Sequence, residues 1–303
     1  MNLADRLQCR RWPRVAALAL ILASAALGAA AQEDVPFITT PDNVTLAMLR
    51  LAAVGPADRL IDLGSGDGRI VITAARRFGA SGLGVEIDPQ LVERSRVNAK
   101  AAGVERRAEF REQDLFKTDL APFSVITMYL LPEVNLQLRP ALLALRPGTR
   151  IVSHDWDLGD WMPDRTLTVA APDKAIGREK LSRLHLWVVP ARFEGLWCGV
   201  GARVRGLSLT LSQQHQLLSA SAKVSADRSS RGIASSSVGH DAELRFLNGR
   251  ADGATARLIG ANGESMSLRL LDAATIEVSV NAAASPRWRN ARLARSAVAA
   301  CAA

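Results

Sequence analysis

The feature that most constrains this chain is an apolar strand that runs straight into a turn with three glycines and then into a helix. Residues 60–69 read Leu-Ile-Asp-Leu-Gly-Ser-Gly-Asp-Gly-Arg, and residues with helix propensity continue to position 78. Alternate glycines let the backbone turn sharply and let a ligand approach the main chain closely. Many tight loops use the same residues without a ligand, so the turn alone does not separate a nucleotide-cofactor site from a plain loop.

Acids at the ends of two further strands favour the cofactor site. Glu86 lies in the apolar run 82–87, about 20 residues past the turn, where an acid accepts the two hydroxyls of a ribose. Asp114 follows the short strand 108–112 and has apolar neighbours, which suits it to bind an adenine amino group while they cover the ring. The glycine spacing is G-x-G-x-G and Asp62 stands two residues before the first glycine, and both features argue against NAD.

Helical patterns alternate with short apolar strands through the first half of the chain. This alternation predicts a parallel sheet with helices on both faces and ligands at the carboxyl ends of the strands. Asp42 is the expected amino-terminal cap of the first helix. The expected helices are 42–53, 69–78, 89–102 and 133–145, the expected strands are 60–63, 83–87, 108–112, 124–129 and 150–154, and the runs 166–170 and 184–189 form a closing hairpin.

The glycine turn and the three acids resemble the motifs of class I S-adenosylmethionine-dependent methyltransferases. This resemblance implies a doubly wound, Rossmann-like α/β sheet of seven strands, S-adenosyl-L-methionine as the cofactor and no metal. It implies that Glu86 and Ile87 hold the ribose and that Asp114 and Leu115 hold the adenine. The residues that it assigns to the methionine end are Asp62, Gly64, Ser65, Gly66 and Gly68.

Three further segments, 35–41, 129–132 and 148–155, together with Trp161, narrow the resemblance. They are similar to the protein-lysine methyltransferases that act on the ATP synthase c-subunit and the adenine nucleotide translocase, and to their bacterial relatives. The likeness covers roughly residues 35–190 and implies a protein lysine as acceptor. Two alternatives stay open: a small-molecule or lipid methyltransferase, and a non-catalytic envelope binding module on a methyltransferase-like scaffold.

Methyl transfer from a sulfonium needs alignment of donor and acceptor and exclusion of water, and a lysine acceptor must arrive neutral. Tyr129, after the fourth strand, is the first candidate to steer the amine, or it simply closes over the cofactor. His154 and Asp155, at the next strand end, line the acceptor channel or are structural. Asp67 and Arg69 are expected to pair around the helix that follows the glycine turn.

Residues 1–31 have the layout of a secretory signal peptide. Four arginines precede the uncharged run 15–31, which ends in Ala29-Ala30-Ala31. The alternative is an uncleaved membrane anchor, and in either case the folded part is expected outside the cytoplasm, with membrane contact only through this segment. This exported or membrane-associated location is in tension with a cofactor that is made in the cytoplasm. Two explanations stay open: folding and cofactor loading precede export, or the domain stays cytoplasmic with the apolar segment as an atypical anchor.

The methyltransferase domain is expected over residues 32–190, a small all-β barrel or sandwich over 191–282, and a disordered tail over 283–303. Asn248-Gly249 and Asn262-Gly263 are expected hairpin turns in the β domain, and the Ser- and Gly-rich loop 227–240 is expected to be mobile. Cys9, Cys198 and Cys301 imply neither a disulfide framework nor a metal site. The expected strands of the β domain are 207–211, 217–224, 243–246, 255–259, 267–271 and 275–280.

The charge of the chain disfavours nucleic acid as a partner. The leader carries four arginines and one aspartate, so the net charge of +8 falls to +5 in the mature chain, and the surplus is scattered rather than striped. A protein substrate is the expected partner, and membrane and envelope proteins are the candidates for it. The particular acceptor, the oligomeric state and the role of the β domain stay open.

Overall fold

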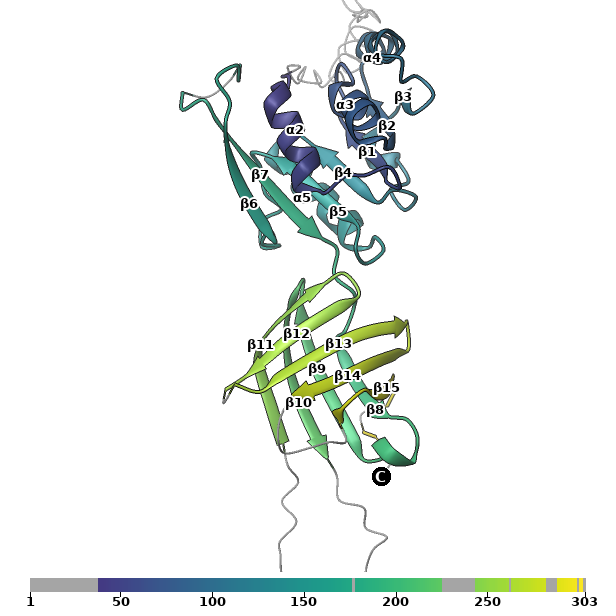
Figure 1. Ribbon diagram of the computed structural model, residues 1–303, viewed down its shortest axis with the longest axis vertical. Coiled ribbons are helices and arrows are strands. Elements are labelled where there is room, and N and C mark those ends of the chain that lie inside the picture. Colours follow the sequence, from purple (N-terminus) through teal and green to yellow (C-terminus); the bar gives the residue numbers. More distant parts are fainter. Residues whose placement is uncertain are drawn as a thin grey trace, which may run out of the picture. The chain divides into compact units, whose positions relative to one another are not determined.

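The computed structural model describes residues 38–175, 178–224, 243–261, 263–281, 288–298 and 300–301. These residues form a seven-stranded sheet flanked by helices and an eight-stranded closed barrel (Figure 1). The predicted signal peptide and the loop 227–240 lie outside the described residues. No helix in the described part of the chain has the length and apolar character needed to cross a membrane.

The sheet has seven strands, as the resemblance implied, and their order is β3-β2-β1-β4-β5-β7-β6. Strands β1 to β5 are parallel, β7 runs antiparallel to β5, and β6 runs antiparallel to β7. The order reverses between β1 and β4, which is the switch point where open α/β sheets bind ligands. The strands are β1 (Arg59–Leu63), β2 (Ser81–Glu86), β3 (Ala108–Glu112), β4 (Val125–Met128), β5 (Arg150–His154), β6 (Arg165–Ala170) and β7 (Leu181–Val188).

Side chains of neighbouring strand residues point to opposite faces, so a strand buried on both faces reads as a continuous apolar run. Leu60 lies in one core cluster and Ile61 in the other. The first cluster includes residues of α2 (Asp42–Leu51), α3 (Arg69–Phe78) and α4 (Pro89–Ala101). The second includes residues of α5 (Pro132–Leu143), together with the buried Trp161 and Trp187. The sheet is therefore covered on both faces, as the alternating pattern predicted.

The prediction that Asp42 caps the first helix is wrong. Pro41 is the residue that precedes the helix, and no side chain caps this end. Asp42 is already helical, and its carboxylate lies 3.9 Å from the Arg69 guanidinium. An acid in the first turn still interacts favourably with the helix dipole.

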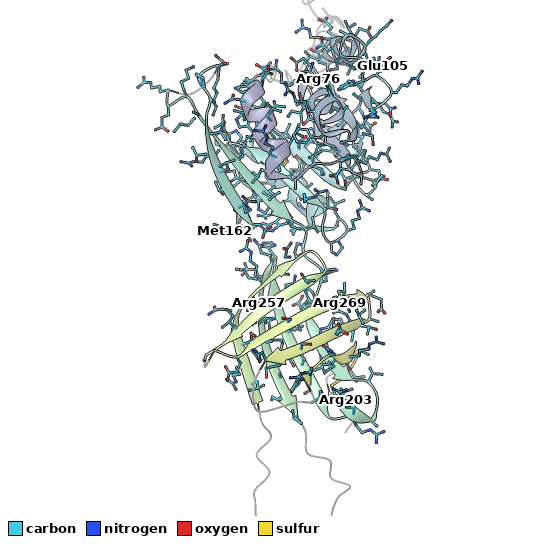
Figure 2. All side chains as sticks on the ribbon, in the orientation of Figure 1. Arg76, Glu105, Met162, Arg203, Arg257 and Arg269 are labelled. Atoms are coloured by element: carbon cyan, nitrogen blue, oxygen red, sulfur yellow. A yellow bond between two sulfur atoms is a disulfide. The ribbon has the colours of Figure 1, made fainter. Side chains whose placement is uncertain are left out.

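The β domain is a barrel rather than a sandwich, with strands coloured green to yellow in Figure 1. Alternate residues face its core, which is filled by large side chains including Phe193, Trp197, Phe246 and Trp288. Arg203, Arg257 and Arg269 are exposed on its outside, as Arg76 and Glu105 are on the helical layer of the sheet (Figure 2). The strands are β8 (Gly195–Gly199), β9 (Leu207–Gln214), β10 (Leu217–Val224), β11 (Glu243–Asp252), β12 (Thr255–Gly260), β13 (Ser265–Asp272), β14 (Thr275–Asn281) and β15 (Ala291–Arg295).

The prediction of a turn at Asn248-Gly249 is wrong, because both residues lie inside β11, next to a register irregularity in its pairing with β12. The chain turns instead between Asp252 and Thr255, where Gly253 has a φ of +53°. Gly249 serves packing: a Cβ there would collide with the side chain of Leu258 on the neighbouring strand. Gly249 is therefore needed for the close approach of β11 to Leu258, although in the sequence an Asn-Gly pair indicates a turn.

The prediction of a disordered carboxyl-terminal tail is wrong for residues 291–295, which form β15 and close the barrel between β14 and β8. Cys301 forms a disulfide with Cys198 of β8, so the expectation that the cysteines imply no disulfide is also wrong. The two cysteines are 103 residues apart in sequence and come together only because β15 pairs with β8. The disulfide therefore ties the end of the chain to the barrel.

Candidate functional site

The glycine turn between β1 and α3 needs its glycines. Gly64, Gly66 and Gly68 have φ values of +72°, +53° and +81°, a region that side chains disfavour. The amides of Gly64 and Ser65 both donate to the carbonyl of Val85 on β2, at 3.0 Å. The turn is thus fixed to the neighbouring strand.

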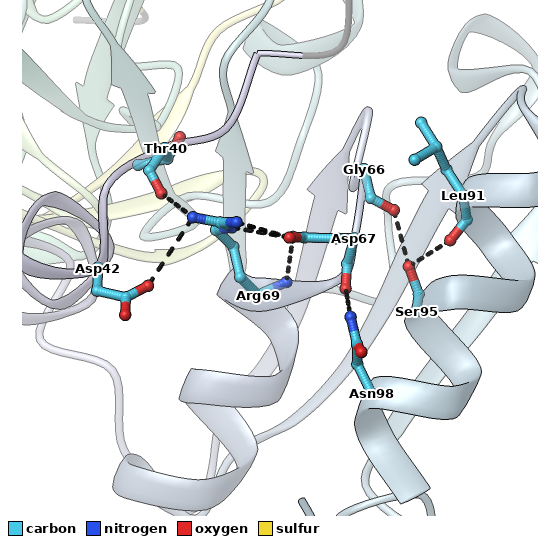
Figure 3. Close-up of polar contacts among 8 residues, drawn as sticks. All are labelled: Thr40, Asp42, Gly66, Asp67, Arg69, Leu91, Ser95 and Asn98. Carbon is cyan, nitrogen blue, oxygen red and sulfur yellow. Dashed lines mark hydrogen bonds and ion pairs between the residues drawn. The ribbon is translucent and has the colours of Figure 1, made fainter. Parts of the chain in front are cut away.

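Helix α4 holds the turn from its other side (Figure 3). The Ser95 hydroxyl donates to the Gly66 carbonyl at 2.8 Å, and the Asn98 amide donates to the Asp67 carbonyl at 3.0 Å. Because these carbonyls are occupied by α4, the turn is held in one conformation before any ligand arrives. This preorganisation lowers the entropic cost of binding.

Gly84 of β2 is a site residue to which the sequence assigned no role. A Cβ at this position would lie 2.5 Å from the Phe110 ring and 2.6 Å from the Ser65 hydroxyl. Phe110 also packs against Gly68, where a Cβ would lie 2.6 Å from the ring. The close approach of β2 to the turn therefore requires glycine in the strand as well.

Asp62 lies buried at the end of β1, and its carboxyl accepts a hydrogen bond from the Thr127 hydroxyl at 2.7 Å. Burial is the largest cause, and together with the charges of the nearby Glu86 and Asp67 it raises the pKa of this carboxyl to about 8, against the opposing effect of the Thr127 hydrogen bond. The Ser65 hydroxyl beside it is buried and has no hydrogen-bond partner in the described part of the chain. The turn thus presents a buried acid and an unused polar group.

Glu86 ends β2 with its carboxylate directed at the turn. One carboxylate oxygen accepts from the Gly66 amide at 2.9 Å, and the other accepts from the amides of Ile87 and Asp88 at 2.8 and 3.2 Å. Ile87 itself is exposed. The structure therefore brings Glu86 and the glycine turn into direct contact, with an exposed apolar side chain at the same strand end.

Asp114 lies one strand further along the same edge, because the Gln113 amide donates to the Glu86 carbonyl at 2.9 Å. Asp114 caps the short helix η1 (Leu115–Lys117). The hydrogen bond from the Phe116 amide holds the pKa of this carboxyl below its usual range. The Lys117 ammonium, 3.3 Å away, lowers it as well. Leu115 is half-buried and Phe116 is exposed, so apolar side chains flank the acid.

These residues fit S-adenosyl-L-methionine. A ligand with an ammonium and a sulfonium supplies positive charge that stabilises the ionised form of the buried Asp62. Its ammonium can also donate a hydrogen bond to the unused Ser65 hydroxyl. Its ribose and adenine match an edge where a carboxylate and exposed apolar side chains follow one another from β2 to β3. The glycine cradle leaves space that a side chain would otherwise fill.

Asp67 and Arg69 pair with each other, as predicted. The Arg69 guanidinium donates to the Asp67 carboxylate at 2.9 and 2.6 Å and to the Thr40 carbonyl at 2.8 Å (Figure 3). Arg69 therefore connects the turn to the segment that precedes α2.

A second group of side chains lies at the ends of β4 and β5. The Tyr129 ring stacks on the His154 ring with centroids 3.9 Å apart, and its hydroxyl lies 3.4 Å from an Asp155 carboxylate oxygen. Burial, followed by the charge of Asp155, raises the pKa of Tyr129 to about 12, so the phenol keeps its proton. Asp155 has a φ of +64°, which places its side chain beside Tyr129 at the cost of a strained backbone.

His154 is buried between two hydroxyls, those of Thr40 at 3.2 Å and Ser182 at 2.8 Å. Burial lowers its pKa to about 4, so the imidazole is neutral at pH 7 although Asp155 lies 3.6 Å away. A neutral, hydrogen-bonded ring forms no ion pair. His154 thus fixes the Tyr129 ring by stacking on it and contributes no charge to the site.

Lys174 is a site residue that the sequence did not reveal. It lies in the hairpin after β6, and its ammonium is 2.6 Å from an Asp155 carboxylate oxygen and 2.6 Å from the Leu181 carbonyl. Its side chain is only 10% exposed. The Arg183 amide donates to the other Asp155 oxygen at 3.0 Å. Only the topology of the sheet could have indicated Lys174: β6 runs parallel to β5, so the hairpin between β6 and β7 lies at the edge of the sheet that carries Asp155.

The two groups of residues are contiguous. Leu130, next to Tyr129, packs so closely on Gly64 that a Cβ there would lie 2.9 Å from its side chain. Thr40 joins them a second time, because its carbonyl accepts from Arg69 and its hydroxyl bonds His154. The arrangement places a cofactor cradle and a tyrosine–aspartate–lysine cluster at one edge of the sheet, which suits transfer of a group between two ligands.

Comparisons with known proteins agree with this chemistry. A family model described as the ANTKMT methyltransferase domain matches residues 62–165. The chain is 40% identical over 137 residues to a protein-lysine N-methyltransferase of Saccharolobus islandicus, covering 45% of this chain and 85% of that protein. It is 41% identical over 108 residues to the lysine N-methyltransferase of the ATP synthase c-subunit from Mus musculus, covering 35% of this chain and 43% of that protein.

A solved structure, titled as an RNA methyltransferase from Salinibacter ruber in complex with S-adenosyl-L-homocysteine, is 49% identical. It covers 52% of this chain and 96% of that one, with a TM-score of 0.47. Both the archaeal relative and this structure correspond to about half of the present chain, whereas the chain spans less than half of the mouse relative.

Proposed function

The chain belongs to the family of S-adenosylmethionine-dependent protein-lysine N-methyltransferases, and on that premise we propose which residues hold the cofactor and where the lysine is methylated. The methionine end lies against Asp62, Gly64, Ser65, Gly66 and Gly68. Glu86 and Ile87 take the ribose, and Asp114 and Leu115 take the adenine. The buried Asp62 and the unused Ser65 hydroxyl support this assignment.

The observation that carries the acceptor assignment is the contact of the β4 end with the glycine turn, through Leu130 on Gly64. We place the lysine amine beside the Tyr129 hydroxyl at this contact. S-adenosyl-L-methionine, when bound, would supply a methyl group on a sulfonium: the amine lone pair would form a bond to the methyl carbon while the carbon–sulfur bond breaks in line and a neutral thioether leaves. Tyr129 donates its proton toward Asp155, so its oxygen lone pair is available to accept an acceptor N–H and to aim the nitrogen lone pair.

His154 and Asp155 act through Tyr129. The stacked imidazole fixes the ring, and the Asp155 carboxylate fixes the direction of the hydroxyl. Leu131 and Trp156, which adjoin this cluster in the chain, are exposed apolar side chains. We propose that a bound acceptor covers these side chains, which excludes water from the amine and favours its uncharged form.

We further propose that the acceptor is a lysine of a membrane or envelope protein and that the mature chain works outside the cytoplasm. Two features support the location: the signal-peptide pattern of residues 1–31, and the disulfide between Cys198 and Cys301, since disulfides persist in oxidising compartments. Because the cofactor is made in the cytoplasm, loading before export accounts for its supply. A compartment-sensitive reporter fused to the carboxyl end tests the location, and activity only in the cytoplasm would refute it.

Calorimetry of S-adenosyl-L-methionine binding to the purified mature chain tests the cofactor assignment, with Glu86→Ala as the paired variant. The proposal expects saturable binding that the variant loses, because the carboxylate both meets the ribose and holds the Gly66 amide. Glu105→Ala is a matched control, since Glu105 is exposed and precedes β3, at the edge of the sheet opposite the cradle. Binding that survives Glu86→Ala unchanged would contradict the assignment.

A further inference from the structure

The ion pair between Lys174 and Asp155 stands at the proposed acceptor position and has no role in holding the cofactor. The ammonium is 2.6 Å from the carboxylate oxygen that also faces the Tyr129 hydroxyl. Both side chains are largely buried, at 10% and 19% exposure. The methyl transfer as described so far uses Tyr129 and Asp155 but leaves this buried cation unexplained.

A carboxylate alone at this place would oppose the reaction. An ionised Asp155 next to the acceptor would favour the ammonium form of the incoming lysine, and an ammonium has no lone pair with which to attack. Asp155 is ionised: although burial raises its pKa, the Lys174 ammonium and the Arg183 amide outweigh that effect and hold the pKa below its usual range. The site needs a permanent positive charge to cancel this carboxylate.

We propose that Lys174 is a positioning residue of the methyl transfer, whose ammonium neutralises Asp155 so that the acceptor lysine beside Tyr129 arrives as a free amine. The proposal rests on the proposed function, because it concerns the same acceptor site. In the Lys174–Asp155 pair, the Asp155 carboxylate still accepts a hydrogen bond from Tyr129, but the pair as a whole has no net charge. A neutral residue in place of Asp155 would give up the second oxygen, which accepts from the Arg183 amide.

The other groups around this position do not supply the same charge. The phenol of Tyr129 stays protonated and the imidazole of His154 stays neutral. Asp67 and Arg69 satisfy each other. Lys180 donates to the Lys174 carbonyl at 2.5 Å rather than to a carboxylate. His185 of β7 also interacts with Asp155, and burial lowers its pKa, so it adds no charge at pH 7. The other charged and titratable groups that face the site are Tyr129 from β4, His154 and Asp155 from β5, Lys174 and Lys180 from the hairpin, Arg183 from β7, and Asp67 with Arg69 at the start of α3.

The test is the pH dependence of single-turnover methyl transfer to a lysine peptide, with enzyme preloaded with the cofactor so that binding does not enter the rate. In the wild-type chain, the rate should rise with an apparent pKa well below the value of about 10.4 for free lysine. In Lys174→Met, the uncancelled carboxylate at about 6 Å should move this pKa up by about two pH units at an effective dielectric constant of about 20. Lys174→Arg keeps the charge and should restore the wild-type profile.

A double variant separates electrostatics from structure. Asp155→Asn combined with Lys174→Met removes both charges, so its apparent pKa should return toward the wild-type value even if its rate stays low. Arg178→Met, in the same hairpin, removes an exposed positive charge and should leave the profile in place. Cofactor binding by calorimetry shows that each variant is folded.

The outcomes are distinct. Wild-type enzyme that binds the cofactor but transfers no methyl group to any lysine refutes the proposed function, and the inference with it. Wild-type transfer with an apparent pKa near 10.4 refutes the inference alone, whether or not a Lys174 variant folds. An unshifted profile in a folded Lys174→Met, or an equal shift in Arg178→Met, also refutes it.

Discussion

Binding of the cofactor should release a proton from Asp62. In the free protein, burial raises the pKa of this carboxyl to about 8, so it is only about 10% ionised at pH 7. A cationic ligand favours the ionised form and drives the proton off. Binding at pH 7 should therefore release about 0.9 protons per cofactor, and the apparent affinity should rise about tenfold, or about 1.4 kcal/mol, between pH 6 and pH 7.

Calorimetry in two buffers with different ionisation enthalpies measures this release directly. Asp62→Asn is the matched variant, because its side-chain carbonyl can still accept from the Thr127 hydroxyl but has no proton to lose. The amino group of the cofactor also titrates near pH 8, and its contribution is common to both proteins, so the difference between them isolates Asp62. Equal proton release by the two proteins at pH 7 would refute the reasoning.

Four further outcomes are expected. Because the folded state holds the Asp62 proton, this group stabilises the cofactor-free protein fully below about pH 4 and loses that contribution as the pH rises through about 8. A shift of about four pKa units corresponds to about 5 kcal/mol, so Asp62→Asn should raise the free energy of unfolding at pH 8 by up to that amount, measured by urea titration. Gly84→Ala should cost about 1–3 kcal/mol and weaken cofactor binding, because its Cβ meets Phe110 and Ser65, whereas Gly55→Ala, with open space around it, should do neither. Tyr129→Phe should keep cofactor binding and the stack on His154 but slow single-turnover transfer about tenfold or more; an unchanged rate would exclude the hydroxyl from the reaction. Cys198→Ser should lower the free energy of unfolding of the barrel by about 4 kcal/mol, because the disulfide closes a long loop. An unchanged melting temperature would show that the pairing of β15 with β8 is enough to hold this segment.

The methyltransferase sheet was predictable because its central strands β1, β4 and β5 are short apolar runs buried on both faces and separated by helices with clear ends. The bounds of α3, β3 and β5 agree with the expected ranges, since glycine and charged residues interrupt the pattern at those ends. The spacing from the glycine turn to Glu86 was also informative, because it reflects one β-strand and one helix.

Lys174 could not be predicted, because nothing in its local sequence marks it. Its place beside Asp155 depends on the direction of β6 and on the length of the hairpin, which are long-range properties of the sheet. The same holds for the barrel. The disulfide depends on the pairing of β15 with β8, and Gly249 was misread because a glycine selected for packing against Leu258 looks like a turn residue in isolation.

The central claim is that this chain transfers a methyl group to a protein lysine at the edge where the glycine turn meets Tyr129. The most direct measurement incubates the mature chain with methyl-labelled S-adenosyl-L-methionine and a membrane and envelope fraction, and identifies the labelled product after hydrolysis. The account predicts label in methylated lysine, lost in Gly66→Arg, which fills the turn, and retained in Gly55→Ala. Label only in lipid, RNA or a small molecule, or none from a chain that binds the cofactor, would contradict it.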